Sequence, residues 1–260
     1  MIIFVIPAHN EEDNIESLLM NLDEKMKALN MKYHTIMVDD GSTDSTKERI
    51  LRYEKKIPLE VIDNGNNKGV GNCFKSGFFR ALELAKDDDI IVTKEADNTS
   101  YLDTLDVMLQ KIGSGDDVVL ASCFAPGGKV IGVPLIKLIL SLTINYALRF
   151  IAPIKGIHTY SSFYRAYKQR ILRRAIYAYE GRLIEDRGFS CMVEVLIKLS
   201  RLPIRITETP TILQYCKRVG KSKMKVSKTI LGYFVLLKNN MFYGKRRRDA
   251  ILARFGEYGG

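Results

Sequence analysis

The sequence predicts an α/β fold, built on a Rossmann-like, mostly parallel sheet with helices on both faces. Short apolar runs rich in Val and Ile alternate with longer segments of helical periodicity over about the first 120 residues, which is the pattern of parallel strands joined by crossover helices. The chain has 260 residues, 46% of them hydrophobic, so one large domain with a sizeable core is expected. Polar turns follow four of the apolar runs, where an open α/β sheet binds its ligands.

The apolar runs predict five strands, and the periodic segments between them predict four helices. We expect strands over residues 2–6, 35–38, 59–62, 90–93 and 118–121. We expect helices over roughly residues 11–29, 42–53, 69–85 and 102–112. No basic leader or cleavage site precedes the first strand, so no secretory signal is expected. The four cysteines show neither metal-ligand spacing nor obvious pairing, which fits a reducing cytoplasm.

The four polar turns read PAHNEE from residue 7, VDDGSTD from residue 38, NGNNKGVGN from residue 64 and KEADNTS from residue 94. Each alone has an ordinary explanation, such as helix capping or Asn-Gly turn formation. Because the carboxyl ends of parallel strands lie at one edge of a sheet, the four turns together predict a binding site there.

The glycine-rich turn carries neither of the common phosphate-loop signatures. Gly69 and Gly71 occur in GVGNCF, but Phe74 stands where a dinucleotide fingerprint has its third glycine, and no G-x-x-x-x-G-K-[ST] occurs. These absences argue against a dehydrogenase and against a P-loop NTPase.

The net charge of +10 is distributed unevenly along the chain. Residues 118–179 and 209–248 contain no Asp or Glu, and they carry nine and eleven Lys or Arg respectively. The remainder of the chain is therefore net negative. This pattern indicates two surfaces with different partners, and a solvated basic face without a partner is the alternative.

Residues 134–152 predict a helix that lies in the plane of a membrane. Polar side chains recur every four residues, at Lys137, Ser141, Asn145 and Arg149, and the rest of the helix surface is apolar. The two charges divide the run into pieces shorter than the roughly 20 residues that a bilayer span requires. An interfacial helix is therefore expected, with a core helix of a soluble domain as the alternative.

A second apolar face follows nearer the C-terminus. It consists of Ile230, Leu231, Phe234, Leu237 and Met241, bracketed by Lys225, Lys228, Lys238 and residues 245–248. Basic residues beside an apolar helix attract anionic lipid headgroups, so an anionic membrane surface is an expected partner. Nucleic acid is not expected, because the sequence contains no recognised nucleic-acid module and no interleaved aromatic platform.

Taken together, the motifs resemble those of glycosyltransferase family 2, the inverting GT-A enzymes that use nucleotide-sugars. PAHNEE resembles P-x-x-N-E, VDDGSTD resembles D-D-x-S-x-D, NKGVGNCFKSG resembles N-x-G-x-x-x-A-x-x-x-G, and EAD stands in the place of D-x-D. Later in the chain, ASCFAPGG resembles G-S-R-Y-x-x-G-G, SSFYRAYKQRIL resembles S-G-F-R-A-Y-x-R-x-x-L, and RVGKSKM matches R-x-x-G-x-S-K. The resemblance is greatest to the dolichyl- or polyprenyl-phosphate mannosyl- and glucosyltransferase branch.

This resemblance implies a GT-A fold and a divalent metal, Mg²⁺ or Mn²⁺, between acidic side chains and the pyrophosphate of the donor. Asp97 is expected to hold the metal, with Glu95 beside it or on the ribose, since all-oxygen sites suit these ions. The metal would stabilise the charge that develops on the departing nucleoside diphosphate. The alternative is that Asp97 caps a helix that begins near Tyr101.

The resemblance also implies which residues bind the donor nucleotide. Pro7, His9 and Glu11 are expected to contact the base and ribose, and Asp40 to accept a hydrogen bond from a base N–H. Asp39 is expected either to join Asp40 or to support the turn.

Basic side chains are implied for the phosphates, because Arg offers a fork of donors and Lys a point charge. Arg218, Ser222 and Lys223 lie in RVGKSKM, a loop expected to close over the donor diphosphate or the acceptor phosphate, with a solvated loop as the alternative. Arg165 is a second candidate for this task. Lys68 is expected either to approach the nucleotide or to be solvated.

The implied reaction is a direct displacement at the anomeric carbon of GDP-mannose or a UDP-hexose, with a polyprenyl phosphate or a glycolipid as the acceptor. A phosphate acceptor is already anionic, whereas a hydroxyl acceptor needs a general base. Glu194, Asp186 and Glu185 are the candidate bases. Glu194 lies on an apolar helix, so a buried structural acid is the alternative reading of that residue.

These implications divide the chain into three parts. Residues 1–122 are expected to bind the nucleotide-sugar, and residues 123–215 to form the acceptor side of the same domain. Residues 216–260 are expected to supply the basic loop and a C-terminal amphipathic helix. The expected location is peripheral, on the cytoplasmic face of a membrane; the sequence does not indicate an oligomeric state.

Four positions depart from the family pattern. Glu95 replaces the first Asp of D-x-D, Cys123 replaces the Arg of G-S-R-Y, and Thr159 and Phe163 replace an Asp and a Gly where the acceptor or sugar would bind. Two other functions therefore stay open. One is a sugar-nucleotide pyrophosphorylase, although its glycine-rich N-terminal signature is absent. The other is a non-enzymatic, membrane-associated nucleotide-sugar-binding protein.

Overall fold

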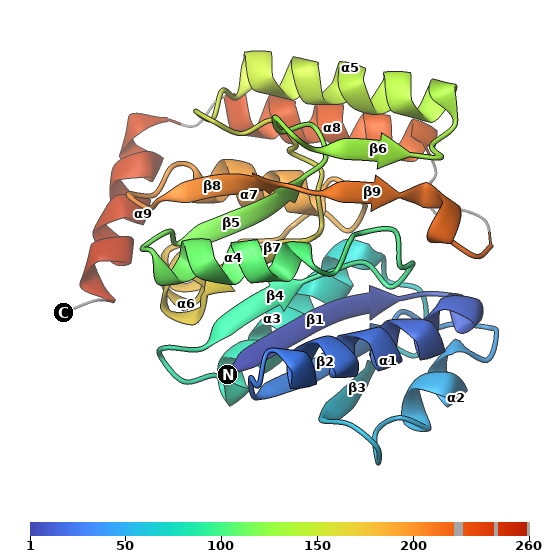
Figure 1. Cartoon of the computed structure of the whole chain (residues 1–260). Coiled ribbons are helices and arrows are strands. Elements are labelled where there is room, and N and C mark those ends of the chain that lie inside the picture. Colours follow the sequence, from blue (N-terminus) through green and yellow to red (C-terminus); the bar gives the residue numbers. More distant parts are fainter. Residues whose placement is uncertain (221–225, 242–243, 259–260) are drawn as a thin grey trace.

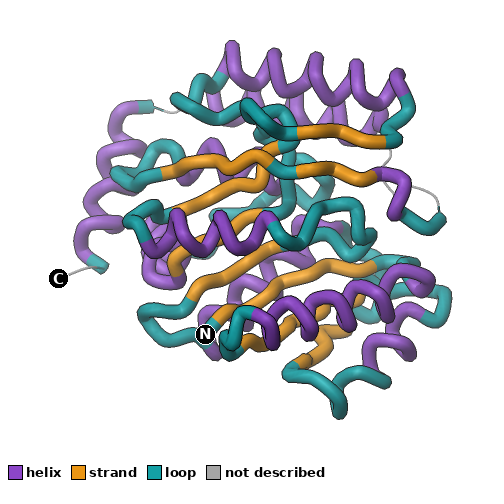
Figure 2. The backbone as a smooth tube through the Cα atoms, viewed as in Figure 1, coloured by secondary structure: helices purple, strands orange, loops and turns teal. Residues whose placement is uncertain are grey.

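A computed structural model describes residues 1–220, 226–241 and 244–258 of the chain. Its centre is a seven-stranded sheet with the order β3-β2-β1-β4-β7-β5-β8, and a two-stranded sheet of β6 and β9 lies beyond it (Figures 1 and 2). The strands are β1 Ile2–Ala8, β2 Tyr33–Asp39, β3 Leu59–Asp63, β4 Ile90–Thr93, β5 Val118–Ser122, β6 Lys129–Ile131, β7 Arg165–Lys168, β8 Ile206–Pro210 and β9 Ile212–Gln214. Neighbouring strands of the large sheet pair in parallel, except that β7 is antiparallel to β4 and β5. The mostly parallel α/β fold is confirmed.

Helices cover both faces of this sheet. They are α1 Glu12–Ala28, α2 Thr46–Leu51, α3 Val70–Leu84, α4 Thr104–Gly113, α5 Leu135–Ile151, α6 Gln169–Ala178, α7 Cys191–Leu199, α8 Val226–Met241 and α9 Lys245–Glu257, with a 3₁₀ turn at Tyr215–Lys217. The apolar sides of α1, α2 and α4 share one core with the sheet, and those of α3, α6 and α7 share the other. In β1, Ile3 and Val5 face the α3 side while Phe4 and Ile6 face the α1 side, because successive strand residues point to opposite faces.

The five strands expected from the apolar runs are all present, with ends that differ by at most two residues. The helix expected over residues 42–53 is shorter than predicted and begins at Thr46. Its expected first turn is a loop instead, because Ser42 donates through its backbone N–H and its hydroxyl to the carboxylate of Asp39, and the N–H of Thr46 binds Asp44. Side-chain bonds of this kind compete with helix formation.

Helices α5 and α8 lie side by side at the top of Figure 1, and both carry exposed apolar side chains. On α5, Ile136 is 73% exposed and Phe150 is 90% exposed, and on α8, Leu231 and Phe234 are 64% and 67% exposed. The alternative of a core helix over residues 134–152 is therefore wrong. Within the described ranges, no helix combines the length and the apolar character needed to cross a membrane.

Three residues of the polar stripe of α5, Lys137, Ser141 and Asn145, face the protein, whereas the fourth, Arg149, is exposed. The side chain of Asn145 is buried, donates to the carbonyl of Ser141 at 2.8 Å and accepts from the backbone N–H of Tyr160 at 2.7 Å. Lys137 binds the hydroxyl of Tyr215 at 2.9 Å. The amphipathic character of α5 is thus the reverse of that of an ordinary surface helix, in which the apolar stripe faces the core.

Candidate active site

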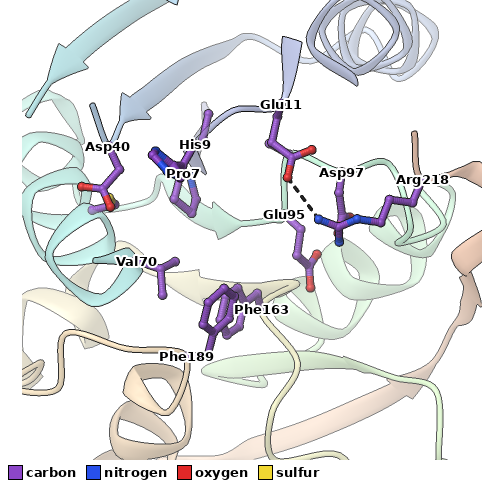
Figure 3. A pocket seen from close by; sticks show the side chains of 13 residues that line it. Pro7, His9, Glu11, Asp40, Val70, Glu95, Asp97, Phe163, Phe189 and Arg218 are labelled. Atoms are coloured by element: carbon purple, nitrogen blue, oxygen red, sulfur yellow. Dashed lines mark hydrogen bonds and ion pairs between the residues drawn. The ribbon is translucent and has the colours of Figure 1, made fainter. Parts of the chain in front are cut away.

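The turns that follow β1, β2 and β4 meet at the carboxyl edge of the sheet and enclose a cavity of about 110 Å³ (Figure 3). Other lining residues come from the start of α3 and from segments before β7, before α7 and after the 3₁₀ turn. The lining residues are Pro7, Ala8, His9, Glu11, Asp40, Val70, Cys73, Glu95, Ala96, Asp97, Phe163, Phe189 and Arg218. Most of the residues that the sequence suggested for the nucleotide and the metal thus lie around one space.

Asp40 lies at one end of the cavity and fixes the glycine-rich turn. Its carboxylate accepts hydrogen bonds of 2.9 Å from the amide of Asn64 and from the backbone N–H groups of Lys68 and Gly69. Asp39 does not line the cavity. Its carboxylate accepts hydrogen bonds from Ser42, so of its two expected roles it has the one of supporting the turn. The side chain of Lys68 lines a separate surface groove.

Two glycines of this turn, Gly69 and Gly71, allow close packing against the segment before α7. A Cβ atom at Gly71 would clash with the carbonyl of Asp186, and the N–H of Gly71 donates to the carbonyl of Arg187 at 3.0 Å. The segment before α7 can therefore approach α3 closely, and this approach places Phe189 at the cavity wall.

At the other end, Arg218 lies between two carboxylates. Its guanidinium forms ion pairs with Asp97 and, at 3.2 Å, with Glu11 (Figure 3). The second oxygen of Asp97 accepts from the N–H and hydroxyl of Thr99 at 3.1 and 2.7 Å. Glu95 accepts from the hydroxyl of Ser100 at 2.8 Å. One oxygen of Asp97 thus accepts hydrogen bonds within its own turn, and its other oxygen pairs with the guanidinium of Arg218.

A buried lysine lies next to this carboxylate pair. The ammonium of Lys94 donates to the carbonyl of Ser100 at 3.2 Å and lies 5.4 Å from the centre of the Tyr164 ring. Burial lowers the pKa of Lys94, whereas the charges of Glu95 and Asp97 raise it. Lys94 was not among the residues predicted for the site. Its position directly after the apolar run of β4 was a signal that its charge lies buried beside Glu95 and Asp97.

The carboxylates of Glu95 and Asp97 fit a divalent ion as part of its oxygen shell. Desolvation raises the pKa of Glu95, Lys94 lowers it, and the neighbouring Asp97 raises it, so a cation near Glu95 would offset the cost of its ionised form. Among the described residues, no three His, Cys, Asp or Glu side chains gather to hold a metal by themselves. The remaining ligands would have to be phosphate oxygens and water, which is how Mg²⁺ is commonly held.

A groove of about 250 Å³ continues from the cavity and passes between α5 and α8. Its inner end shares five residues with the cavity, namely Glu95, Asp97, Phe163, Phe189 and Arg218. Its outer part is lined by the inward stripe of α5, by Tyr215 and by the inner side of α8 around Tyr233. The groove thus leads from the carboxylate pair to the two helices with exposed apolar side chains.

Arg165 and Glu194 are not brought to the site, and their predicted catalytic roles do not fit this structure. Arg165 is fully buried on β7, and its guanidinium donates to the carbonyls of Ser162 and Tyr160 at 2.7 and 2.8 Å. It holds the loop before β7 because buried guanidinium donors need acceptors. Neither residue lines the cavity or the groove.

Glu194 is a buried structural acid, which was the alternative to its predicted role as a general base. Its carboxylate pairs with Lys198 at 2.7 Å and accepts at 2.9 Å from the backbone N–H groups of Glu185 and Asp186. Glu185 pairs with the same lysine, and Asp186 binds Gly188 and Ser190. None of the three carboxylates lines the site. Ser222 and Lys223 lie outside the described residues.

One of the departures from the family pattern, Thr159, has a structural explanation. The hydroxyl of Thr159 shares a hydrogen bond of 2.7 Å with that of Ser122 and accepts from the N–H of Phe124, so it ties the loop before β7 to the end of β5. Burial raises the pKa of the Cys123 thiol to about 11. Phe163 lies at the junction of the cavity and the groove.

Comparison with known proteins finds the same family over most of the chain. The family model described as Glycosyl transferase family 2 matches residues 3–175. The chain is 29% identical, over 88% of its length, to a dolichol-phosphate mannosyltransferase of Pyrococcus furiosus, and it spans 60% of the length of that relative. It is 28% identical to an undecaprenyl-phosphate mannosyltransferase of Micrococcus luteus, covering 86% of this chain and 87% of that one.

Solved structures show the same fold at lower sequence identity. A glucosyl-3-phosphoglycerate synthase of Mycobacterium tuberculosis, in complex with Mn²⁺, UDP and phosphoglyceric acid, superposes with a TM-score of 0.59 at 17% identity, covering 98% of this chain and 78% of that one. TarS of S. aureus superposes with a TM-score of 0.55 at 19% identity, covering 99% of this chain and 71% of that one. The expected GT-A fold is confirmed.

Proposed function

The chain belongs to glycosyltransferase family 2, and on this premise we propose that it transfers a sugar from a nucleoside diphosphate to a polyprenyl phosphate at a membrane surface. The observation that carries the proposal is the shared end of the cavity and the groove, where Glu95, Asp97 and Arg218 border both spaces. A donor in the cavity and an acceptor in the groove would meet there. The names of the relatives support the same acceptor class.

In this function Pro7, His9 and Asp40 bind the nucleoside end of the donor. Asp97 and Glu95 hold Mg²⁺ or Mn²⁺, which when bound offsets the charge of the leaving diphosphate. Arg218 pairs with Asp97 and Glu11 in the free protein, and it is placed to turn its fork toward phosphate oxygens once a cation takes its place.

The acceptor phosphate enters through the groove, where Lys137 supplies positive charge. Because this phosphate is anionic, it attacks the anomeric carbon without a general base, from the face opposite the diphosphate, and the configuration inverts. A route without a general base agrees with the position of Glu194, because this candidate base is buried and paired with Lys198.

The test is transfer from radiolabelled nucleotide-sugars to polyprenyl phosphate in vesicles, with and without Mn²⁺ or Mg²⁺. We expect label in the lipid phase only when metal is present. Release of sugar 1-phosphate with added pyrophosphate, in place of lipid labelling, would favour a pyrophosphorylase. Binding of donor without turnover would favour a non-enzymatic binding protein.

The outward apolar side chains of α5 and α8 are proposed to enter the interface of an anionic membrane. Residues 118–179 and 209–248 contain no acidic residue, and the exposed basic residues include Arg149 on α5, Lys238 on α8 and residues 245–248 at the start of α9. Apolar side chains and basic flanks together are what an interfacial helix needs. A location on the cytoplasmic face is part of this proposal.

Replacing Phe150 and Leu231 together with serine is expected to weaken binding to vesicles of phosphatidylglycerol and phosphatidylcholine. Each buried side chain of this size contributes about 1.5–3 kcal/mol, so the two together contribute about 3–6 kcal/mol and the partition coefficient should fall by roughly a hundredfold or more. Co-sedimentation with vesicles measures it. Met20→Ser, at a 51% exposed position on α1, is the matched control and should bind as the parent does; equal loss in both variants would contradict the assignment.

A further inference from the structure

The junction between cavity and groove has one charged wall and one aromatic wall. Glu95, Asp97 and Arg218 form the charged wall, and Phe163 and Phe189 form the other. Figure 3 shows the two rings together below Glu95, on the far side of the space from Glu11. Under the proposed function the transferred sugar must lie at this junction, because its anomeric carbon has to meet both the diphosphate and the acceptor.

The two rings of the aromatic wall pack against each other, and Phe163 has further contacts behind it. The rings of Phe163 and Phe189 are stacked, with centroids 5.9 Å apart and planes 15° from parallel. Phe74 packs edge-on against Phe163 at 5.2 Å, and the carbonyl of Phe163 accepts a hydrogen bond of 2.6 Å from the hydroxyl of Thr93. These contacts hold Phe163 in place beside Phe189, and neither ring carries a polar atom that could meet a ligand.

The two rings themselves offer a sugar no hydrogen-bonding partner. Beside it the cavity is lined by Val70 and Cys73, and burial raises the pKa of the Cys73 thiol far above its usual range, so that side chain stays neutral. A sugar hydroxyl pressed against such a surface loses water and gains no partner, whereas a methyl group is favoured there. Under the proposed function, the polar groups of the opposite wall would be engaged with phosphate and cation.

We propose that Phe163 and Phe189 determine the sugar specificity, and that the transferred sugar presents an apolar substituent to them. The donor class is then a nucleoside diphosphate carrying a deoxy or an N-acylated hexose, rather than the fully hydroxylated parent. This inference rests on the proposed function and names its donor. Pocket contacts with a methyl-sized group discriminate by roughly tenfold to a hundredfold.

The experiment compares matched donors in the vesicle assay. GDP-rhamnose is set against GDP-mannose, and UDP-N-acetylglucosamine against UDP-glucose, and kcat/KM is measured for each with the full chain and Mn²⁺. In the pair whose base the protein accepts, we expect the deoxy or N-acylated sugar to exceed its parent by about tenfold or more. Phe189→Tyr, which adds a hydroxyl to the wall, should reduce this ratio severalfold.

Phe78→Leu is the matched control, because Phe78 belongs to the same core on α3 and packs on Tyr167 without lining either space. It should keep the parental ratio. Transfer with a ratio near one, or a ratio that Phe189→Tyr leaves unchanged, overturns this inference and leaves the proposed function standing. Absence of transfer from all four donors overturns the proposed function itself, and the inference with it.

Discussion

Asp97→Asn is expected to lower kcat/KM for sugar transfer by about a thousandfold, the scale of loss when a group that stabilises leaving-group charge is removed. The amide keeps the shape of the side chain and still accepts the hydrogen bonds that Thr99 donates to one oxygen of Asp97. It loses the negative charge that pairs with Arg218 and that a divalent ion requires. The loss should therefore fall on turnover and metal binding, with little change in fold.

The measurement combines transfer kinetics with calorimetric titration of nucleoside diphosphate in the presence and absence of Mn²⁺. In the parent protein Mn²⁺ should tighten nucleotide binding, and in Asp97→Asn this dependence should disappear. Asp103→Asn is the matched control, since Asp103 pairs with Lys25 on the surface and does not line the site. Full activity of Asp97→Asn would contradict the metal assignment.

Arg218→Ala should lower kcat by about a hundredfold, as loss of one charge-stabilising donor does, and should strengthen Mn²⁺ binding in the absence of donor. The second effect has the opposite sign because Arg218 neutralises Glu11 and Asp97 in the free protein. Without Arg218, the carboxylates of Glu11 and Asp97 keep uncompensated negative charge, which attracts a cation more strongly.

Mn²⁺ affinity without nucleotide is read by electron paramagnetic resonance, and kcat by the vesicle assay. Lys217→Ala is the control, because Lys217 is the exposed neighbour of Arg218 and does not line the cavity. It should leave both quantities close to the parental values. A lower Mn²⁺ affinity in Arg218→Ala would show that Arg218 does not compete with the metal.

The sequence was sufficient to predict five strands of the large sheet and the edge at which the site forms, but it did not predict β7 and β8 or the small sheet of β6 and β9. Apolar runs mark the strands because buried parallel strands carry apolar residues on both faces, and the turns after them converge because parallel strands end at one edge. The prediction that His9, Asp40 and Asp97 lie around one space needed no more than this. The short helix α2 was overpredicted because the bonds of Asp39 to Ser42 depend on the fold of the turn.

Side-chain partners were harder to predict, because they depend on residues distant in sequence. Arg165 and Glu194 carry the charges that a phosphate site or a general base needs, but the first satisfies backbone carbonyls and the second pairs with Lys198. The sequence showed the polar stripe on α5 but not whether that stripe faces the protein or the solvent, because a helical pattern alone does not say which side is turned inward. Asn145 settles the direction by binding the backbone of Tyr160.

That reversed arrangement of α5 has a kinetic consequence for the proposed function. A polyprenyl chain would keep its hydrocarbon among lipid tails while only its head rose into the groove, so no step would carry the tail through water. Encounter between protein and acceptor would then be a two-dimensional search. Velocity would follow the mole fraction of acceptor among the surrounding lipids, and diluting the suspension with buffer would change it little.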